Sequence, residues 1–537
     1  MEQTAIKIDN NYKITLEDFE RITRGNYKIE LSDNKEYISY INRGNEIIRE
    51  TIKRHVPIYG VNTGFGDSCR NQIYYSYAKS LQENLVKFHG CGVGPYFSEA
   101  ESHGMILLRL ISNSKGHSGV TYMLLKQLER YINVPILPVI PELGSVGASG
   151  DLTPLSYIAA TLMGSRKVYY KGKIVKTQEA LDKENIKALV FEPKEALAIL
   201  NGTSVMTAVS AYATIDAKKI IRLTELTTAL AIEALKGNKG SLSDFNHQAK
   251  PHLGQIKTAR TIKNYLSTSK MAKTQDEINL DVYSPDLDEK SNVLLERTIQ
   301  DKYSLRCTPQ IIGVLWDIMT WLEDWVTIEM NSANDNPLVD VEHVTIYNGG
   351  NFYGGHICQG MDSLRAGLAN LADLIDKQIE LLVDEKFSNG LPANLIHPDE
   401  EHHFVYHGFK AMQICCTALT VEIHSQAQPV SILSRPTESL NQDKVSLGTI
   451  SARHTRNVIR LMENILAIHL LALCQAIELR GSHQFSHCAK DILNEIRKLV
   501  PFVDKDREMD EDIQKIVSLI GTNILTDIMD KYNKNID

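Results

Sequence analysis

The stretch from Val205 to Lys236 constrains the fold of this chain most, because it contains neither glycine nor proline. Thr203 and Ser204 precede it as candidate helix caps, and Gly237 marks its end. As one continuous helix it would be roughly 45 Å long, at about 1.5 Å per residue. A helix of that length must bury an apolar face along other helices, so a helical bundle is expected.

Further long helices are predicted near residues 308–330, 360–385, 409–425 and 450–480. Polar, turn-rich joints separate them, namely NSANDNP (331–337), YNGGNFYGG (347–355) and RPTESLNQD (435–443). The first two hundred residues differ, because prolines and glycines break their apolar stretches. We therefore expect a mainly α fold in which a mixed, loop-rich N-terminal domain precedes a long central helical bundle. The expected domains are residues 1–202, the bundle at 203–480 and a C-terminal helical region at 481–537.

Charge and cysteine usage exclude several classes of protein. The net charge of −8 argues against a general nucleic-acid binder, which would usually carry a basic stripe. None of the eight cysteines forms a C-x-x-C pair, so neither a zinc ribbon nor a dense disulfide framework is indicated. The N-terminus has no apolar core typical of a signal peptide, and the most apolar run (465–477) is too short to span a bilayer. A cytoplasmic protein without membrane partners is predicted.

The segment GSVGASGDLTPLS (144–156) is the strongest candidate for chemistry. It can be a flexible turn before a helix, with Asp151 or Thr153 as the cap. A phosphate-binding loop is disfavoured, because neither glycine-rich phosphate motif is present. In the third interpretation, the Gly150 amide nitrogen attacks the Ala148 carbonyl to close a five-membered ring. Loss of water from the ring and from the Ser149 side chain then gives 4-methylideneimidazol-5-one (MIO), an electrophile that no unmodified side chain offers.

Six motifs in order resemble those of the aromatic amino acid ammonia-lyases, a family that includes phenylalanine, tyrosine and histidine lyases and the related 2,3-aminomutases. The resemblance covers about residues 50–480. Its motifs are YGVNTGFG (59–66), GSVGASGDLTPLS (144–156), LNGTS (200–204), QDKYSLRCTPQ (300–310), NSANDNPL (331–338) with GGNF (349–352), and NQDKVSLG (441–448).

The resemblance implies elimination of ammonia from an L-arylalanine to give a trans-arylacrylate, with MIO as the electrophile and no metal or nucleotide. It also implies a homotetramer of D2 symmetry whose active sites each combine three subunits. The implied catalytic residues are Tyr59 as the base, Ala148, Ser149 and Gly150 as the source of MIO, Asn201, Tyr303 and Arg306. The implied substrate-binding residues are Gly66, Phe88, His89, Leu152, Gln300, Asn334, Phe352, Glu438 and Gln442.

These residue types suit the chemistry. A free amine is a poor leaving group, and addition to MIO makes it a better one. Tyr59 as a base requires a pKa below its usual value near 10, lowered by cationic or hydrogen-bonding neighbours. Arg306 suits a bidentate grip on the substrate carboxylate. Taken singly, Tyr59 can be a packing aromatic, Arg306 a structural ion pair and Asn201 a helix cap.

The substrate ring is expected to meet Phe88 and His89, which stand at the family's specificity segment in NLVKFHGCGVG (84–94). Phenylalanine lyases usually show Phe-Leu there, one group of tyrosine lyases His-Leu, and histidine lyases Ser-His, so this chain mixes patterns. Histidine lyases carry a glutamate where this chain has Gln442. Without this glutamate, an imidazole would lose a charge-assisted hydrogen bond, which contributes about 1.5–3 kcal/mol of binding free energy. The predicted order is phenylalanine first, tyrosine second and histidine third.

Of three alternatives to an ammonia-lyase, one stays open and two are disfavoured. A 2,3-aminomutase would use the same residues, and no motif excludes it. Fumarase-like lyases use a G-S-S-x-M-P-x-K-x-N loop that this chain lacks. A non-enzymatic relative would be expected to have lost Ser149, Tyr59 or Arg306. His483 and His487 have i, i+4 spacing but no evident third ligand, so a metal site is not predicted.

Overall fold

The computed structural model describes residues 5–25, 27–283, 292, 294–295, 298–396 and 404–533. Two compact units emerge from the contacts. Unit one comprises residues 1–215, 322–362 and 429–456, and unit two comprises residues 216–321, 363–428 and 457–537. The expected linear division at 202/203 and 480/481 stays a prediction, because a compact unit is not necessarily an independently folding domain.

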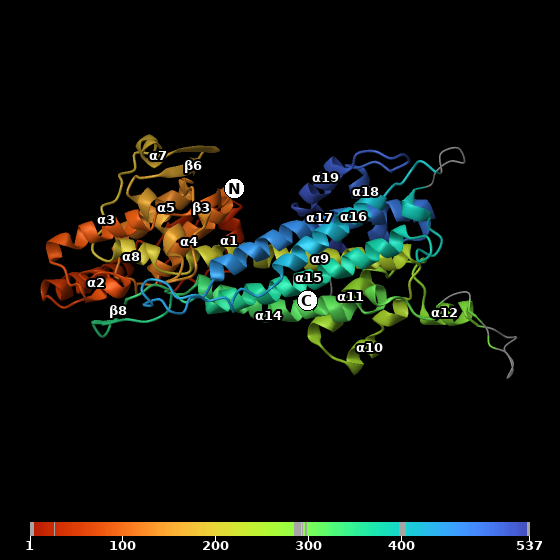
Figure 1. The fold of residues 1–537 in the computed structure, drawn as a ribbon, viewed down its shortest axis with the longest axis horizontal. Coiled ribbons are helices and arrows are strands. Elements are labelled where there is room, and N and C mark those ends of the chain that lie inside the picture. Colours follow the sequence, from red (N-terminus) through yellow and green to blue (C-terminus); the bar gives the residue numbers. More distant parts are fainter. Residues whose placement is uncertain are drawn as a thin grey trace. The chain divides into compact units, whose positions relative to one another are not determined.

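Four long helices continue from one unit's residues into the other's. They are α9 (Ser204–Ala234), α14 (Thr308–Met330), α15 (Gly355–Val383) and α17 (Gly448–Arg480), labelled in Figure 1. Together with α16 (Lys410–Gln426) they confirm all five predicted helices, with ends that differ by a few residues at most. The mainly α fold is therefore confirmed. The polar, turn-rich joints between the apolar stretches were sufficient to locate these helices.

Unit one combines shorter helices with small sheets. Its shorter helices are α1 (Leu16–Thr23), α2 (Lys35–Lys53), α3 (Ala78–Phe88), α4 (Glu99–Ser114), α5 (Tyr122–Asn133), α6 (Leu152–Leu162), α7 (Thr177–Lys183) and α8 (Glu195–Leu200). Its strands are β1 (Ile6–Ile8), β2 (Ile29–Leu31), β3 (Val93–Tyr96), β4 (Leu137–Pro138), β5 (Pro141–Leu143), β6 (Lys167–Tyr170), β7 (Lys173–Lys176), β8 (Leu338–Asp340) and β9 (Thr345–Tyr347). The pair β1–β2 is parallel, whereas β3–β5, β4–β6–β7 and β8–β9 are antiparallel.

The core of unit one is built around α4, in which every residue from Glu101 to Ser114 is buried. A capping box starts this helix: the Glu101 amide donates to Ser98 Oγ at 3.3 Å, and the Ser98 amide donates to Glu101 Oε2 at 2.8 Å. The helices α6 and α8 are likewise almost wholly buried. The short loops that join these buried helices are therefore held on a rigid support.

Unit two is helical in its described part. Besides its shares of the long helices and α16, it contains α10 (Asp244–Ala249), α11 (Leu253–Tyr265), α12 (Gln275–Asp281), α13 (Tyr303–Arg306), α18 (His487–Arg497), α19 (Asp510–Ile520) and α20 (Ile524–Tyr532). Within it, α14 contacts α9 where Trp316 Nε1 donates to Glu225 Oε1 at 2.8 Å, and α15 contacts α9 where Gln378 Nε2 donates to Thr228 Oγ1 at 3.1 Å. These helices run side by side in Figure 1.

Only α17, among the described helices, is long and apolar enough to cross a membrane, and 72% of its most apolar window is buried within the protein. Such burial is typical of a core helix.

Candidate active site

The triplet Ala148-Ser149-Gly150 lies in the loop between β5 and α6, where the backbone turns tightly. Gly147, Ser149 and Gly150 all have positive φ, of 77°, 51° and 78°. For serine this conformation is uncommon. A Cβ on Gly150 would lie only 2.1 Å from the Gly202 carbonyl oxygen, so this position accepts no side chain. This backbone is consistent with the compressed turn that ring closure requires.

A second segment, Asn201–Gly202 at the end of α8, holds this turn from one side. Asn201 Nδ2 donates to the Ser149 carbonyl oxygen at 3.0 Å, and the Gly202 amide donates to the same oxygen at 3.3 Å. In return the Asp151 amide donates to the Gly202 carbonyl at 2.8 Å, which completes a parallel bridge between Gly150 and Gly202. Two donors therefore converge on the Ser149 oxygen.

Asp151 does not cap its own helix. It stands at the start of α6 without a side-chain bond to that helix, and its Oδ2 instead accepts from the Met206 amide of α9 at 2.8 Å. Its Oδ1 accepts from the hydroxyls of Ser145 and Thr449. Burial raises the pKa of this carboxyl to about 6, against the effect of these hydrogen bonds. The interpretation of Asp151 as the cap of the following helix was wrong, because a distant helix start competes for the same oxygen atoms.

The triplet borders a cavity of about 420 Å³ in unit one. Its lining is mostly polar and comes from four separate stretches of the chain. The lining residues are Tyr59, Ala148, Ser149, Asn336, Asn348, Phe352, Asn441, Gln442, Asp443 and Lys444. The structure thus brings together Tyr59, the triplet, Phe352 and Gln442, as the resemblance implied. Sequence reasoning missed Asn336, Asn348, Asn441, Asp443 and Lys444, although the first four lie in the polar joints that it singled out and Lys444 lies in the motif NQDKVSLG.

Tyr59 is half-buried at the cavity, and its phenolic oxygen accepts from the Gly66 amide at 2.9 Å. Burial raises the pKa of Tyr59 above its ordinary value, and the negative charge of Glu438 raises it further. The Gly66 hydrogen bond alone among the main influences lowers that pKa. In the described part of this chain, the pKa of Tyr59 is therefore raised rather than lowered as the proposed base requires.

Glu438 and Gln442 lie on one tight turn, in which the Thr437 and Gln442 backbones pair. Gln442 Nε2 donates to Ser149 Oγ at 3.2 Å, so this side chain contacts the triplet directly. Glu438 Oε2 accepts from the Asp67 amide at 2.8 Å and lies so close to Gly66 that a Cβ there would be 1.9 Å away. A carboxylate and a carboxamide are therefore presented beside Tyr59 and Ser149.

Phe88 and His89 end α3 and stack on each other, with ring centroids 4.4 Å apart. Phe65, next to Gly66, approaches the Phe88 ring at 6.2 Å. Burial lowers the pKa of His89 to about 4, so the imidazole is neutral at neutral pH and offers one donor and one acceptor. Neither residue is among those that line the cavity, and Phe88 is 56% exposed.

Asn334 is not available to a substrate in this structure. Its Oδ1 accepts from Arg109 Nη2 at 2.8 Å and from Ser112 Oγ at 3.2 Å, and its Nδ2 donates to Thr203 Oγ1 at 2.8 Å. The side chain is buried and committed to the interior of unit one. Neighbouring side chains thus satisfy both of its polar atoms in this structure, and the expectation that Asn334 contacts substrate stays a prediction. Leu152 is half-buried at the first position of α6, directly after the loop.

The three remaining implied residues, Gln300, Tyr303 and Arg306, belong to unit two. Tyr303 is 71% exposed and begins α13. The Arg306 guanidinium lies over the Tyr303 ring, 4.6 Å from its centroid, and its Nε donates to the Asp301 carbonyl at 3.0 Å. Among the residues that the structure describes, no carboxylate bonds the two terminal nitrogens of Arg306, and Gln300 is exposed.

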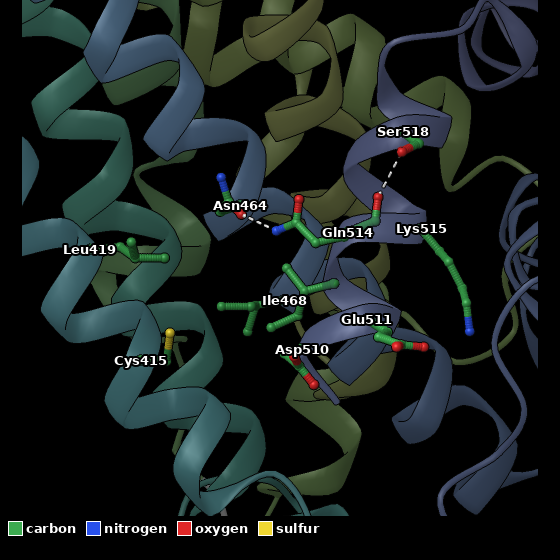
Figure 2. Close-up of a pocket in the computed structure, with 10 residues that line it drawn as sticks. Cys415, Leu419, Asn464, Ile468, Asp510, Glu511, Gln514, Lys515 and Ser518 are labelled. Atoms are coloured by element: carbon green, nitrogen blue, oxygen red, sulfur yellow. Dashed lines mark hydrogen bonds between the residues drawn. The ribbon is translucent and has the colours of Figure 1, made fainter. Parts of the chain in front are cut away.

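Unit two also contains a larger cavity, of about 670 Å³, between α16, α17 and α19 (Figure 2). Cys415, Leu419 and Ile468 line one side and Asp510, Glu511 and Gln514 the other. The Ala148-Ser149-Gly150 triplet borders the smaller cavity and not this one, so the chemistry is assigned to the smaller cavity. Among the described residues, no group of three or more His, Cys, Asp and Glu could hold a metal ion, and His483 and His487 are exposed.

Comparison with known proteins gives a consistent result over nearly the whole chain. The model of a family described as aromatic amino acid lyase matches residues 14–498. A histidine ammonia-lyase of Halalkalibacterium halodurans is 34% identical over 512 residues, 95% of each chain, and one of Clostridium tetani is 35% identical over 522 residues, 96% of each chain. The crystal structure of a tyrosine aminomutase from Streptomyces globisporus has a TM-score of 0.93 at 34% identity, covering 98% of this chain and 99% of that one.

Proposed function

The chain belongs to the aromatic amino acid lyase family, and from this premise we propose that it eliminates ammonia from L-histidine to give the trans-arylacrylate urocanate. That it is a carbon–nitrogen lyase follows from the family and the named relatives. The observation that carries the proposed chemistry is the tightly turned triplet at the edge of a cavity bordered by Tyr59 and Gln442. The carbonyl oxygen of Ser149 in this triplet accepts two hydrogen bonds.

The comparisons do not support phenylalanine as the first substrate. The relatives named above are histidine ammonia-lyases, and His89 stands where histidine lyases also carry histidine. Gln442 had disfavoured an imidazole because it replaces a glutamate. Glu438, four residues earlier on the same turn, offers a carboxylate next to Tyr59 that can take its place as the partner of the imidazole.

The residues present fit the MIO group. The Cβ-free position at Gly150, the positive φ of Ser149 and the donors from Asn201 and Gly202 are what a five-membered ring with an exposed carbonyl oxygen requires. The group would supply a carbon electrophile that makes the substrate amine a better leaving group. Asn201 and Gly202 would hold the Ser149 oxygen, while Tyr59 removes the β-proton and Tyr303 holds the amine.

Arg306 would bind the substrate carboxylate, with Gln300 beside it. We propose the D2 homotetramer that the resemblance implies, with active sites that combine residues of three subunits. In such an assembly the positive charge of an Arg306 supplied by another subunit would lower the pKa of Tyr59, which burial and Glu438 raise in the single chain. We also propose a cytoplasmic location, consistent with the burial of the apolar helix α17.

A 2,3-aminomutase is the second candidate, because the tyrosine aminomutase structure matches this chain at a TM-score of 0.93. Chromatography of reactions with L-histidine, L-tyrosine and L-phenylalanine separates the possibilities. Urocanate from histidine, at a higher kcat/KM than either other product, is the expected result. A β-amino acid as the main product would establish a mutase, and a preference for phenylalanine would overturn the proposed substrate.

Intact-protein mass tests the cofactor separately. The mass should fall short of the translated mass by two waters, and Ser149→Ala should restore the full mass and abolish turnover. Full translated mass in active wild-type protein would refute the MIO assignment.

A further inference from the structure

Arg109 lies in the middle of α4, within the apolar stretch MILLRLI, and its side chain is fully buried. Burial lowers its pKa to about 10, so the guanidinium still carries its charge at neutral pH. A buried charge of this kind is costly unless its donors find acceptors. No motif identified this residue, and the proposed chemistry does not use it.

One hydrogen bond of Arg109 reaches the segment that holds the triplet, and two hold the guanidinium in place. Nη1 donates to the Asn201 carbonyl oxygen at 2.8 Å, while Nη2 donates to Ser112 Oγ at 2.5 Å and to Asn334 Oδ1 at 2.8 Å. A Cβ on Gly202 would lie 2.2 Å from Nη1, so the glycine permits this approach. All three acceptors are neutral oxygen atoms.

The carboxylate of Asp335, which is also buried in unit one, is bonded elsewhere. Its Oδ2 contacts Lys194 Nζ at 2.5 Å, and its Oδ1 accepts from Ser118 Oγ at 2.8 Å. Lys194 is fully buried as well, so this pair neutralises itself. The charge of Arg109 is therefore directed at the Asn201 carbonyl rather than at a hydrogen-bonded carboxylate.

The Asn201 carbonyl and the Gly202 amide form one peptide group. Arg109 binds the oxygen of this peptide group, and the N–H of the same group donates to the Ser149 carbonyl oxygen at 3.3 Å. A cation on the carbonyl side of a peptide polarises the group and strengthens the hydrogen bond that its N–H donates. The same contact fixes Asn201, whose Nδ2 is the second donor to the Ser149 oxygen, at 3.0 Å.

We propose that Arg109 is a positioning residue for the reaction: it holds and polarises the Asn201–Gly202 peptide so that both donors stabilise negative charge on the Ser149 oxygen. The inference rests on the proposed function, because this charge develops when a nucleophile adds to the exocyclic carbon derived from Ser149. The electron pair of the broken double bond then moves onto the ring and its Ser149 oxygen.

Arg109→Lys tests the proposal, with Arg365→Lys as the matched control. Arg365 is also fully buried, and its Nη2 donates to the Gln428 carbonyl at 3.0 Å. The purified full-length proteins are first weighed intact, which shows the fraction that has lost two waters. Cyanide, a small nucleophile that needs no substrate-binding residue, is then added, and the rate of adduct formation per mature ring is followed by mass. Apparent melting temperatures report folding.

Arg109→Lys should slow cyanide addition at least about tenfold, the change expected for one weakened charge-assisted bond. It should lower kcat more than it raises KM, and Arg365→Lys should leave the addition rate within about twofold of wild type. Ser112→Ala, which removes one acceptor of Nη2 and leaves the charge in place, should slow addition about two- to fivefold. A folded Arg109→Lys protein that keeps its full translated mass would also support the proposal, since the held peptide shapes the turn that closes.

A wild-type rate of addition in Arg109→Lys would overturn the inference. If that variant does not fold, Ser112→Ala decides: slowed addition supports the inference, and a wild-type rate overturns it. Failure of the proposed function would look different, because the wild-type protein itself would then have its full translated mass and form no adduct.

Discussion

Gly150→Ala is expected to block formation of the cofactor and to destabilise the protein. Two causes contribute, a steric clash with Gly202 and the positive φ of residue 150, and a control variant separates them. The new Cβ would lie 2.1 Å from the Gly202 oxygen, whereas carbon–oxygen contacts are ordinarily at least about 3.3 Å. The neighbour is backbone, so the two segments must move apart by about 1.2 Å. That movement breaks the bond from the Asp151 amide to Gly202 at 2.8 Å and the bond from the Gly202 amide to Ser149 at 3.3 Å.

Two lost hydrogen bonds cost about 1–3 kcal/mol together. The positive φ of 78° adds about 1–2 kcal/mol for any residue with a Cβ. Gly172→Ala is the matched control, because Gly172 has a φ of 73° and a Cβ there would meet nothing within 4 Å. The control isolates the conformational cost and should lower stability by only about 1–2 kcal/mol.

The assay combines intact mass with the apparent melting temperature of both variants, measured side by side. Gly172→Ala should keep the two-water deficit, whereas Gly150→Ala should have its full translated mass and melt at the lower temperature. If Gly150→Ala matures completely and melts with Gly172→Ala, the close approach of Gly150 to Gly202 is not what shapes the triplet.

The other predictions concern the base and the substrate. Tyr59→Phe should lower kcat by about 10²–10⁴-fold, the usual effect of losing a general base, while substrate still binds; near-normal turnover would exclude Tyr59 from proton abstraction. Glu438 raises the pKa of Tyr59, so Glu438→Gln should lower it and move the acidic limb of the kcat/KM–pH profile to lower pH; an unmoved limb would mean that Tyr59 does not set it. Gln442→Glu should shift kcat/KM toward histidine over phenylalanine by about tenfold or more, because a carboxylate in the cavity pairs with the imidazole; an unchanged ratio would place the ring elsewhere.

Local patterns in the sequence were sufficient to predict where the long helices lie and that the triplet forms a tight turn. The absence of glycine and proline located α9 to within a few residues, because these residues act on the backbone where they stand. The polar joint that follows Met330 marked the end of α14, which itself contains Pro309 and Gly313. The small residues on either side of Ser149 pointed to a tight turn, and Ser149 has positive φ. The cavity gathers Tyr59, Phe352 and Gln442 as the ordered motifs implied.

The features that could not be predicted from the sequence depend on contacts between segments far apart in the chain. The alignment of Gly150 with Gly202, the capping of α9 by Asp151 and the enclosure of Asn334 by Arg109 all join residues more than fifty positions apart. The raised pKa of Tyr59 in the single chain could not be deduced for the same reason, since its burial and the nearby Glu438 arise only in the folded chain. An arginine inside the apolar stretch of α4 was the one local sign of the buried polar network, and its acceptors could not be deduced from it.

The bridge between residues 150 and 202 also bears on the life of the newly made chain. The turn at 148–150 is held by a segment synthesised about fifty residues later, and Asp151 is occupied only once the start of α9 exists. We expect a newly made chain to stay chemically immature until that segment has docked. If the proposed cofactor forms, the loss of two water molecules is a covalent record that this part of the interior assembled, and the intact mass distinguishes chains in which the segment once docked from those in which it never did.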